Sequence, residues 1–388
     1  MKIPKNNSKN IQLCGIGNGL VDIQYKISDE LFNSLNLPKS EMRLVAPDEQ
    51  MELLNKINES SEKFSYNKCC GGSATNTIQS FAEFGGKTAY LTAVGDDENG
   101  NFYYSELENS KVKYKQNFIP NLLTGICLVL ITPDGERTML TSLGASKSFS
   151  IENLDENLIA QSEWLYLEGY KFSETTGSLV IDKAIEIAKN NETKIAISAS
   201  DLFIIELFNE QLIRAVKQAD LFFCNENEAK LIAKFIKQNN EELANYDCEN
   251  SDDAMKIVSK ICPNIVMTKG KNGSKILFEN KIYEFKAFKT DVIDTTGAGD
   301  MFAGAFLFGL LNGEKIISLS GNSENIDISE LKLTKKLNKI INENVINFAG
   351  NLASKSSSLI VSQFGARYSG SFEEIVAATK LIEVNNIF

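Results

Sequence analysis

Residues 294–300 read Asp-Thr-Thr-Gly-Ala-Gly-Asp and run directly into the apolar stretch 301–306, Met-Phe-Ala-Gly-Ala-Phe. This pattern predicts a tight turn that opens a buried helix. The first N–H groups of a helix have no partner within it, and the helix dipole makes its start positive. Because Gly297, Ala298 and Gly299 present almost no side chain, a charged ligand can approach their backbone N–H groups. The stretch therefore predicts an anion-binding helix start.

Asp300 stands in the first turn of this predicted helix, where its carboxylate would repel a bound anion. That placement indicates a general base, which takes a proton from a hydroxyl that attacks a phosphorus atom. The alternative is that Asp294 or Thr296 caps an ordinary helix and that the glycines only permit a turn. Two aspartates and two glycines within seven residues, entering a helix of small and apolar side chains, favour the anion site.

Three stretches of the chain together resemble a known family. Residues 294–300 resemble the signature of the ribokinase-like carbohydrate and nucleoside kinases, also called the phosphofructokinase B family. The stretch 71–76, Gly-Gly-Ser-Ala-Thr-Asn, resembles the N-terminal signature of that family, and 225–228, Asn-Glu-Asn-Glu, matches its Asn-x-x-Glu pattern at a strand end. The resemblance runs from about Cys14 to Gly365, with the elements in the family's order. It implies an ATP-dependent kinase that phosphorylates an alcohol group.

The resemblance also assigns roles to residues of the second and third stretches. In the family a Gly-Gly pair and an Asn on the next helix hold sugar hydroxyls, which implies substrate contacts from Gly71, Gly72 and Asn76. The Asn-x-x-Glu pattern places magnesium and phosphate, which implies that Asn225 and Glu228 bind the cofactor, Glu228 holding Mg²⁺ through water. Without the family, a glycine pair before a helix is more often a loop, and acidic residues opening a helix are an ordinary preference.

Asp22 lies just beyond the first predicted strand, where members of the family bind sugar hydroxyls with an Asp, and residues 16–23 resemble the adenosine kinase-like branch. A carboxylate can accept hydrogen bonds from two vicinal hydroxyls, which suits the diol of a ribose or another furanose. Arg137 matches a position where related kinases carry an Arg that reaches the transferred phosphoryl group. The alternative for Arg137 is a solvated charge on a hairpin.

The stretch 266–273, Val-Met-Thr-Lys-Gly-Lys-Asn-Gly, resembles the ATP loop of the family, with Thr268, Gly270 and Gly273 near phosphates or ribose. It is not a Walker A loop, because Gly-Lys-Ser/Thr with the required spacing is absent. Many members of the family also use potassium, and Asp294 and Thr296 match the segment that surrounds it. The resemblance thus implies ATP, Mg²⁺ and a K⁺ site at these two residues.

Composition excludes several classes of function. The net charge of −11 argues against nucleic acid or an anionic membrane as partner, because both require a basic face. No histidine occurs in the chain, which rules out a Ser-His-Asp triad and an imidazole base and leaves proton transfer to Asp, Glu, Lys, Tyr or Cys. The polar start and the absence of an apolar span of ~18 residues predict a cytoplasmic protein. The sequence leaves monomer and homodimer open.

Short apolar runs alternate with helical patterns through most of the chain, which is typical of strands buried on both faces of a parallel sheet. The predicted core strands are 11–16, 88–93, 164–167, 194–198, 221–224 and 265–268. Amphipathic helices are predicted at 75–84, 177–189, 208–217 and 228–236. This βαβ series predicts an α/β fold, a doubly wound and mostly parallel sheet flanked by helices, with ligands at the carboxyl ends of its strands.

Two regions break this alternation. Residues 21–27 and 124–139 predict strands and a hairpin, with Asp-Gly at 134–135 supplying the turn. The resemblance makes them part of a small β-sheet lid over the sugar site, and the alternative is an edge hairpin of the main sheet. We expect one catalytic domain over 11–388, with the lid formed by about 21–45 and 112–141 inserted in it. Residues 314–329 lack periodicity and predict a surface insertion.

The predicted reaction is in-line transfer of the ATP γ-phosphoryl group to a primary hydroxyl of a nucleoside or sugar, with adenosine kinase-like specificity. Asp300 takes the proton, and the amides of residues 297–299 stabilise the equatorial oxygens. Two alternatives remain, namely a ribokinase- or fructokinase-type enzyme for free sugars and a catalytically silent regulator that binds a sugar or nucleoside.

Overall fold

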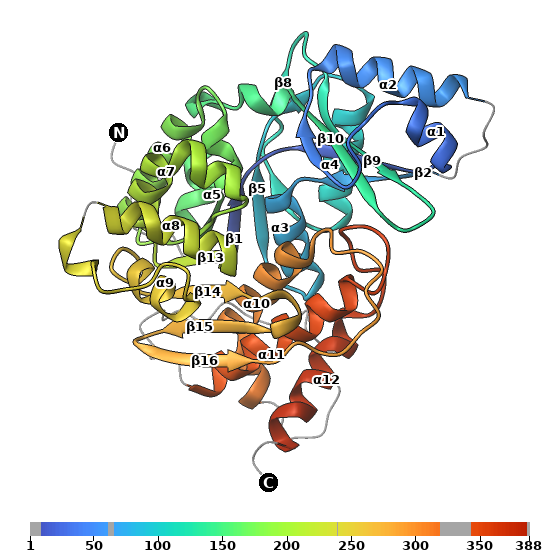
Figure 1. Ribbon diagram of the computed structural model, residues 1–388. Helices are drawn as coiled ribbons and strands as arrows, with labels where there is room; N and C mark the ends of the chain where they lie inside the picture. The colour runs from blue at the N-terminus through green and yellow to red at the C-terminus, as the bar shows by residue number, and fades with distance from the viewer. Residues whose placement is uncertain (1–8, 61–65, 239, 319–342, 386–388) are drawn as a thin grey trace.

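The computed structural model describes residues 9–60, 66–238, 240–318 and 343–385 (Figure 1). A nine-stranded sheet forms its centre. In spatial order its strands are β16 (Lys281–Phe285), β15 (Ser274–Phe278), β14 (Ile265–Thr268), β13 (Leu221–Asn225), β12 (Lys194–Ser198), β11 (Ser162–Glu168), β1 (Ile11–Ile16), β5 (Thr88–Leu91) and β7 (Lys113–Tyr114). The seven strands from β14 to β7 run parallel, and β15 and β16 are antiparallel additions at one edge. The predicted doubly wound sheet and its core strands are confirmed.

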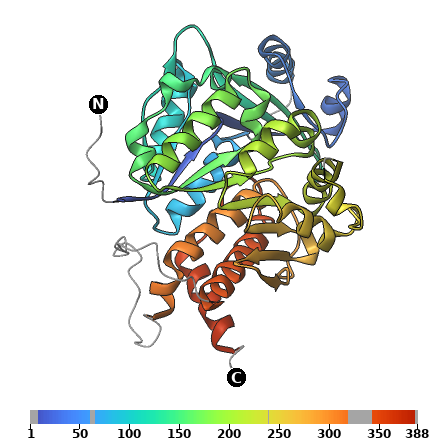
Figure 2. The ribbon, with the colours of Figure 1, turned by 90° about the vertical axis from the view of Figure 1, so that its left-hand side faces the viewer.

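Helices cover both faces of this sheet, as Figures 1 and 2 show. One face carries α5 (Glu156–Ala160), α6 (Gly177–Asn190), α7 (Leu202–Val216), α8 (Glu226–Gln238) and α9 (Ser251–Val258). The other carries α3 (Ser73–Glu83), α4 (Glu98–Asn109), α10 (Ala298–Ser318), α11 (Glu343–Ile360) and α12 (Phe372–Asn385). No helix in these described ranges is long and apolar enough to cross a bilayer.

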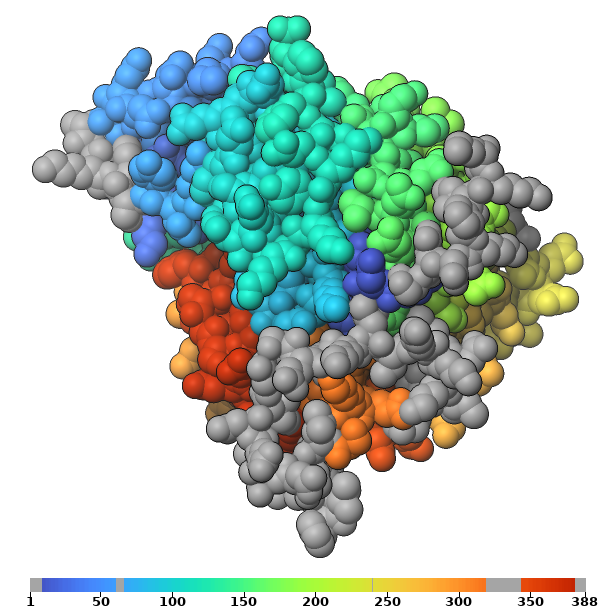
Figure 3. Space-filling model, turned by 180° about the vertical axis from the view of Figure 1, so that it is seen from behind, coloured from blue at the N-terminus to red at the C-terminus, as the bar shows by residue number. Residues whose placement is uncertain are grey.

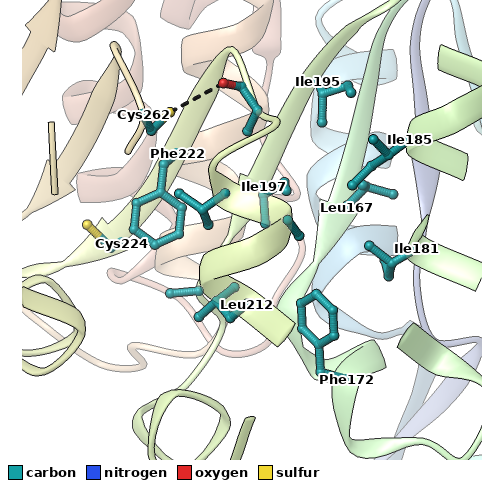
Figure 4. Close-up of a cluster of buried hydrophobic side chains, with 14 of the residues drawn as sticks. Leu167, Phe172, Ile181, Ile185, Ile195, Ile197, Leu212, Phe222, Cys224 and Cys262 are labelled. Atoms are coloured by element: carbon teal, nitrogen blue, oxygen red, sulfur yellow. Dashed lines mark hydrogen bonds between the residues drawn. The ribbon is translucent and has the colours of Figure 1, made fainter. Parts of the chain in front are cut away.

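Each helical layer closes a hydrophobic core against the sheet. Figure 4 shows one of the two cores, where Leu167 of β11 and Phe222 of β13 meet Ile181 of α6 and Leu212 of α7. Such strands are apolar along their whole length because both of their faces are covered.

Seen from behind in Figure 3, the surface of the N-terminal half, in blue to green, lies above that of the C-terminal helices, in orange and red.

A second, five-stranded sheet stands apart from the first. Its strands, in spatial order, are β3 (Met42–Leu44), β10 (Arg137–Gly144), β9 (Thr124–Ile131), β2 (Leu20–Lys26) and β4 (Tyr66–Gly71). The helices α1 (Asp29–Ser34) and α2 (Pro47–Glu59) pack on one face of it through a small apolar cluster (Figure 1). The predicted hairpin forms with Gly135 in its turn at φ +83°, a conformation that favours glycine. The hairpin therefore belongs to a separate small sheet and not to an edge of the main one.

The bounds of the small sheet differ from the expected lid ranges. Residues 113–114 form β7 of the large sheet, and β8 (Phe118–Ile119) pairs with β6 (Val94–Gly95). The edge strand β4 was not predicted, because Tyr66-Asn67-Lys68 is polar and mostly exposed. Short 3-10 helices fill connections at η1 (Ala145–Ser148), η2 (Ile151–Asn153), η3 (Gly169–Ser173), η4 (Glu241–Leu243) and η5 (Gly270–Asn272).

Two helix predictions need correction. α7 begins six residues earlier than predicted, at Leu202, because Asp201 caps it by accepting a hydrogen bond from the Phe203 amide, and its kink lies at Phe208. α10 continues to Ser318, so the first residues of the expected insertion at 314–329 are helical. The remainder of that insertion lies outside the described residues.

The helices α3 and α10 approach each other closely. A Cβ added to Gly304 of α10 would lie 2.6 Å from the Thr77 carbonyl oxygen of α3 and 2.8 Å from the Ser80 Cβ. Only glycine fits at such a contact between two backbones. The start of α3 and the start of α10 are therefore held side by side.

Candidate active site

Two cavities meet at the start of α10. The first, of about 510 Å³, is lined by residues at the carboxyl ends of the large-sheet strands, together with residues of the small sheet. The second, of about 540 Å³, is lined by the segments around 268–273, 287–299 and 354–361. The residues that line both cavities are Thr268, Thr295, Ala298, Gly299 and Phe302. A group placed in one cavity can therefore contact a group placed in the other at this turn.

Asp300 lies in the wall of the first cavity, beside that junction. Its carboxylate accepts hydrogen bonds from the Ser73 hydroxyl at 2.6 Å and from the Asn76 side-chain amide at 3.2 Å, both on α3. Burial raises the pKa of Asp300 to about 6, and these two hydrogen bonds act against the rise. The structure thus holds a carboxylate in one orientation and makes it a stronger base than an ordinary Asp.

The backbone at the start of α10 offers free donors. No acceptor for the amides of Gly297, Gly299 and Asp300 is found within the described residues, as expected for a helix start. The Ala298 amide differs from the prediction, because it donates to the Thr295 carbonyl at 3.2 Å and closes the turn. The amide of Asp300, which lies outside the predicted set 297–299, is available instead.

The two glycines of this turn have different surroundings. Gly297 has a φ of +74°, and a Cβ there would lie 2.8 Å from Ala366, so its backbone requires glycine. Gly299 has no atom within 4 Å of an added Cβ, and it lines both cavities. Gly297 therefore shapes the turn, whereas Gly299 faces open space where a ligand would lie.

Asp22 of β2 also lines the first cavity and is 6% exposed. Burial raises the pKa of its carboxyl to about 7, Arg367 lowers it and Asp300 raises it further. In the small sheet Asp22 stands in register between Cys69 of β4 and Cys127 of β9. Weakly polar thiols thus flank the carboxylate, which leaves it in need of a hydrogen-bonding partner from the cavity.

The glycine pair before α3 brings the backbone against Asp22. A Cβ on Gly71 would lie 2.0 Å from the Asp22 Oδ1, and Gly72 has a φ of +97°. Gly72 and Asn76 line the first cavity. The Oδ1 of Asn76 is buried and has no hydrogen-bond partner among the described residues, so it can accept from a ligand hydroxyl.

Glu168, at the carboxyl end of β11, is a site residue to which sequence reasoning gave no role. It is fully buried in the first cavity wall and accepts hydrogen bonds from the amides of Asn18, at 2.6 Å, and Ala74, at 2.8 Å. Burial raises its pKa to about 7 in spite of these bonds. The available signal was an acidic residue ending a buried apolar strand. Glu168 joins the turn after β1 to the start of α3.

Asn225 and Glu228 line the first cavity at the start of α8. The Glu228 carboxylate accepts from the Asn225 amide at 2.7 Å, and the Asn225 side chain accepts from the Glu228 amide at 2.9 Å, which is a capping box. Burial raises the pKa of Glu228 to about 7, and the neighbouring Asp201 raises it too. A bound cation would relieve the cost of this buried charge.

Magnesium fits this arrangement. The described residues include no group of three Asp, Glu, Cys or His side chains that could hold a metal ion by itself. Mg²⁺ commonly takes one or two carboxylates, several waters and substrate phosphates as ligands, so a single cavity-facing Glu228 is a suitable anchor.

Arg137 of β10 contacts the segment that precedes α10. Its guanidinium forms an ion pair with Asp294 and donates hydrogen bonds to the Thr296 hydroxyl at 3.3 Å and the Ile293 carbonyl at 3.4 Å. It does not line either cavity in the described part of the chain. The structure therefore places Arg137 against residues 293–296, so Arg137 is not a solvated hairpin charge, and its contact with a transferred phosphoryl group stays a prediction.

The second cavity contains the predicted nucleotide loop. Thr268, Gly270 and Gly273 line it, and both glycines have positive φ, +54° and +87°. Its other walls combine apolar and hydroxyl side chains with two lysines, Lys271 and Lys289. Phosphates and a flat heterocycle would find cationic, hydroxyl and apolar partners here.

Comparisons with known proteins agree with this geometry. Residues 39–319 match the model of the family described as pfkB family carbohydrate kinase. Adenosine kinase of Saccharomyces cerevisiae is 27% identical over 316 residues, which cover 78% of this chain and 89% of the relative. The 5-dehydro-2-deoxygluconokinase of Clostridium beijerinckii is 28% identical over 66% of this chain and 76% of its own. The crystal structure of adenosine kinase from Sinorhizobium meliloti has a TM-score of 0.74 at 25% identity and covers 95% of this chain and 99% of its own.

Proposed function

The chain belongs to the pfkB family of carbohydrate kinases and is a phosphotransferase acting on a hydroxyl group, and we propose that its acceptor is the 5′-hydroxyl of a purine nucleoside, adenosine first. The donor is ATP with Mg²⁺, as in the family. One observation carries the proposal. The first cavity joins two buried polar groups that can bind a polyol, Asp22 and Asn76, to a half-buried base, Asp300, at the point where the second cavity begins.

Each group of the site has a chemical part in transfer. Asp300 accepts the proton of the acceptor hydroxyl as that oxygen attacks phosphorus, and Ser73 and Asn76 keep its carboxylate aimed. The amides of Gly299 and Asp300 stabilise charge on the phosphoryl oxygens at the positive end of α10. Mg²⁺ bound beside Glu228 and Asn225 would neutralise the phosphates. Asp22 accepts from the ribose diol, and the small sheet excludes water that would hydrolyse ATP.

A nucleoside fits the first cavity better than a free sugar. Beyond the polar group around Asp22, its walls include Tyr170 and Phe203, whose ring centroids lie 6.0 Å apart, and apolar residues of the small sheet such as Leu44 and Met139. Aromatic and apolar surfaces suit a flat base. A free pentose or hexose has no comparable apolar ring to place there.

The relatives support both candidate acceptors. The relatives named adenosine kinase favour a nucleoside. The relative named 5-dehydro-2-deoxygluconokinase, at a similar identity, keeps a free-sugar kinase as the second candidate.

Initial rates with MgATP and a panel of acceptors test the proposal. We expect kcat/KM for adenosine to exceed that for ribose, fructose and 5-dehydro-2-deoxygluconate by at least ~10-fold, which corresponds to about 1.4 kcal/mol. Phosphorus NMR of the product would identify the phosphorylated hydroxyl. A free sugar that reacts faster than every nucleoside would establish the second candidate. Calorimetric binding of adenosine without any phosphorylation would indicate a silent binding protein.

A further inference from the structure

The guanidinium of Arg137 joins the small sheet to the segment before α10. Arg137 is the first residue of β10, and its side chain is 11% exposed. It meets three oxygens of residues 293–296, namely a carboxylate of Asp294, the hydroxyl of Thr296 and the carbonyl of Ile293. A carboxylate, a hydroxyl and a carbonyl are also the hard oxygen ligands that a metal cation would take.

The carboxylate of Asp294 already has three donors, one of them a cation. Asp294 is 2% exposed, and its carboxylate accepts hydrogen bonds from the Thr296 amide at 2.7 Å and the Gly365 amide at 2.6 Å besides the ion pair with Arg137. A potassium ion at Asp294 and Thr296 would compete with the guanidinium for the same oxygens and would be repelled by its charge. The residues present therefore do not fit the potassium site that the sequence resemblance implies.

We propose that Arg137 supplies, from within the chain, the positive charge that a monovalent cation would supply at Asp294, and that phosphoryl transfer by this protein does not depend on potassium. An uncompensated carboxylate at Asp294 would repel phosphates at the amides of the following turn. Arg137 removes that charge and, through Asp294 and Thr296, fixes the turn 294–299. It is a positioning residue, because it contacts the turn and not the cavities.

The chain provides a matched control for this role. Lys26 of β2 is a second cation on the small sheet, and its ammonium lies 4.3 Å from the centre of the Phe364 ring. The Arg137 guanidinium lies 5.8 Å from the centre of the same ring. No ion pair joins Lys26 to Asp294 among the described residues. Lys26→Met thus removes a neighbouring charge without opening the Asp294 carboxylate.

The experiment compares wild type, Arg137→Met, Arg137→Lys and Lys26→Met. Phosphorylation of adenosine is measured with potassium-free MgATP in choline chloride, then with potassium chloride replacing choline at about 0.1 M ionic strength, where the Debye length is about 10 Å. We expect wild type, Lys26→Met and Arg137→Lys to change less than ~2-fold between the salts. Arg137→Met should lose at least ~10-fold in choline and recover part of it in potassium or on addition of methylguanidinium, because a paired carboxylate left without its partner is costly.

Melting temperatures provide a second measurement that needs no acceptor. The rate assay rests on the proposed function, whereas potassium binding at an opened Asp294 should raise the melting temperature of Arg137→Met, and not of wild type, relative to choline. If no acceptor reacts, the melting temperatures alone decide this inference. A wild-type rate that rises ~10-fold with potassium would overturn it. So would an Arg137→Met variant whose rate and melting temperature are the same in both salts, or a Lys26→Met variant that responds as Arg137→Met does.

Discussion

The two cavities that meet at α10 are opposite in charge. The first is lined by the carboxylates of Asp22, Glu168, Glu228 and Asp300, and its described lining includes no Lys or Arg. The second is lined by Lys271 and Lys289, and its described lining includes no Asp or Glu. In a chain of net charge −11, charge is therefore sorted locally, with carboxylates in the first cavity and ammonium groups in the second. The turn 297–300 is the boundary between them.

Asp300→Asn, at the turn between the two cavities, should cause the largest loss of activity. Asn keeps the shape and the contact with Ser73 but removes the basicity, so we expect kcat to fall by at least ~100-fold with little change in nucleotide affinity. Steady-state kinetics and nucleotide titration on a folded variant measure both effects. Near-normal turnover would remove Asp300 from the role of base.

Asp22→Ala tests the first cavity alone. A buried carboxylate matched to two hydroxyls penalises an acceptor that lacks one, so wild type should disfavour 2′-deoxyadenosine against adenosine by ~1–3 kcal/mol, roughly 5- to 150-fold in kcat/KM. Asp22→Ala should abolish most of that preference while leaving the KM for ATP nearly unchanged, because Asp22 does not line the second cavity. Equal discrimination by wild type and variant would place the diol elsewhere.

Gly297 and Gly299 allow effects on phosphoryl transfer to be separated from effects on the stability of the fold. Gly299→Val places its side chain in open space, so it should lower kcat roughly 10-fold by obstructing one charged hydrogen bond, and it should change the melting temperature little. Gly297→Val should instead lower the melting temperature, because φ is +74° and Ala366 lies against it. Unchanged kinetics with a large loss of stability in Gly299→Val would make this glycine a simple turn residue.

The smallest expected effect is on the pH dependence of stability. Burial raises the pKa of Asp22 to about 7 from an ordinary value near ~4, so its contribution to stability is complete at low pH and is lost as pH rises through about 7. Asp22→Asn does not ionise. The melting temperature of Asp22→Asn minus that of wild type should therefore increase from pH 5 to pH 8. The increase should be about 2 °C for each kcal/mol of stability that wild type loses as its buried Asp22 ionises.

Asp134→Asn is the control for this measurement. The pKa of Asp134 is lowered to about 2, first of all by its hydrogen bond with Lys39, so Asp134 is ionised throughout that range. The difference between Asp134→Asn and wild type should stay constant from pH 5 to pH 8. A constant difference for Asp22→Asn as well would show that Asp22 titrates normally.

The sequence predicted residues of both cavities, and most directly those that lie in contiguous stretches. The turn and the ATP loop are contiguous stretches whose glycines mark the backbone conformation directly, as at Gly297 and Gly273. The first cavity is assembled from separate elements, so Glu168, which bonds residues 150 and 94 positions away, had no local signal. The ion pair of Arg137 had no local signal for a similar reason, since its partner Asp294 is far along the chain and a hairpin charge has many possible partners.

The strands and their alternation with helices were predictable, because burial on both faces makes core strands continuously apolar. The edge strand β4 was not, since its exposed residues Tyr66 and Asn67 carry no such pattern. The kink at Phe208 was missed because apolar residues continue across it.

The contact at Gly304 has a consequence for anyone who wishes to alter acceptor choice by engineering. Because the backbones of α3 and α10 are in contact, the two helices hold Ser73, Asn76 and Asp300 in fixed positions relative to one another. Widening the pocket from that side would separate the base from the groups that aim it. The small sheet carries Leu44 on β3 and Met139 and Thr141 on the neighbouring strand β10, and none of these side chains belongs to α3 or α10. Libraries of substitutions that aim at new acceptors should therefore vary residues of β3 and β10 and leave α3 and α10 unchanged.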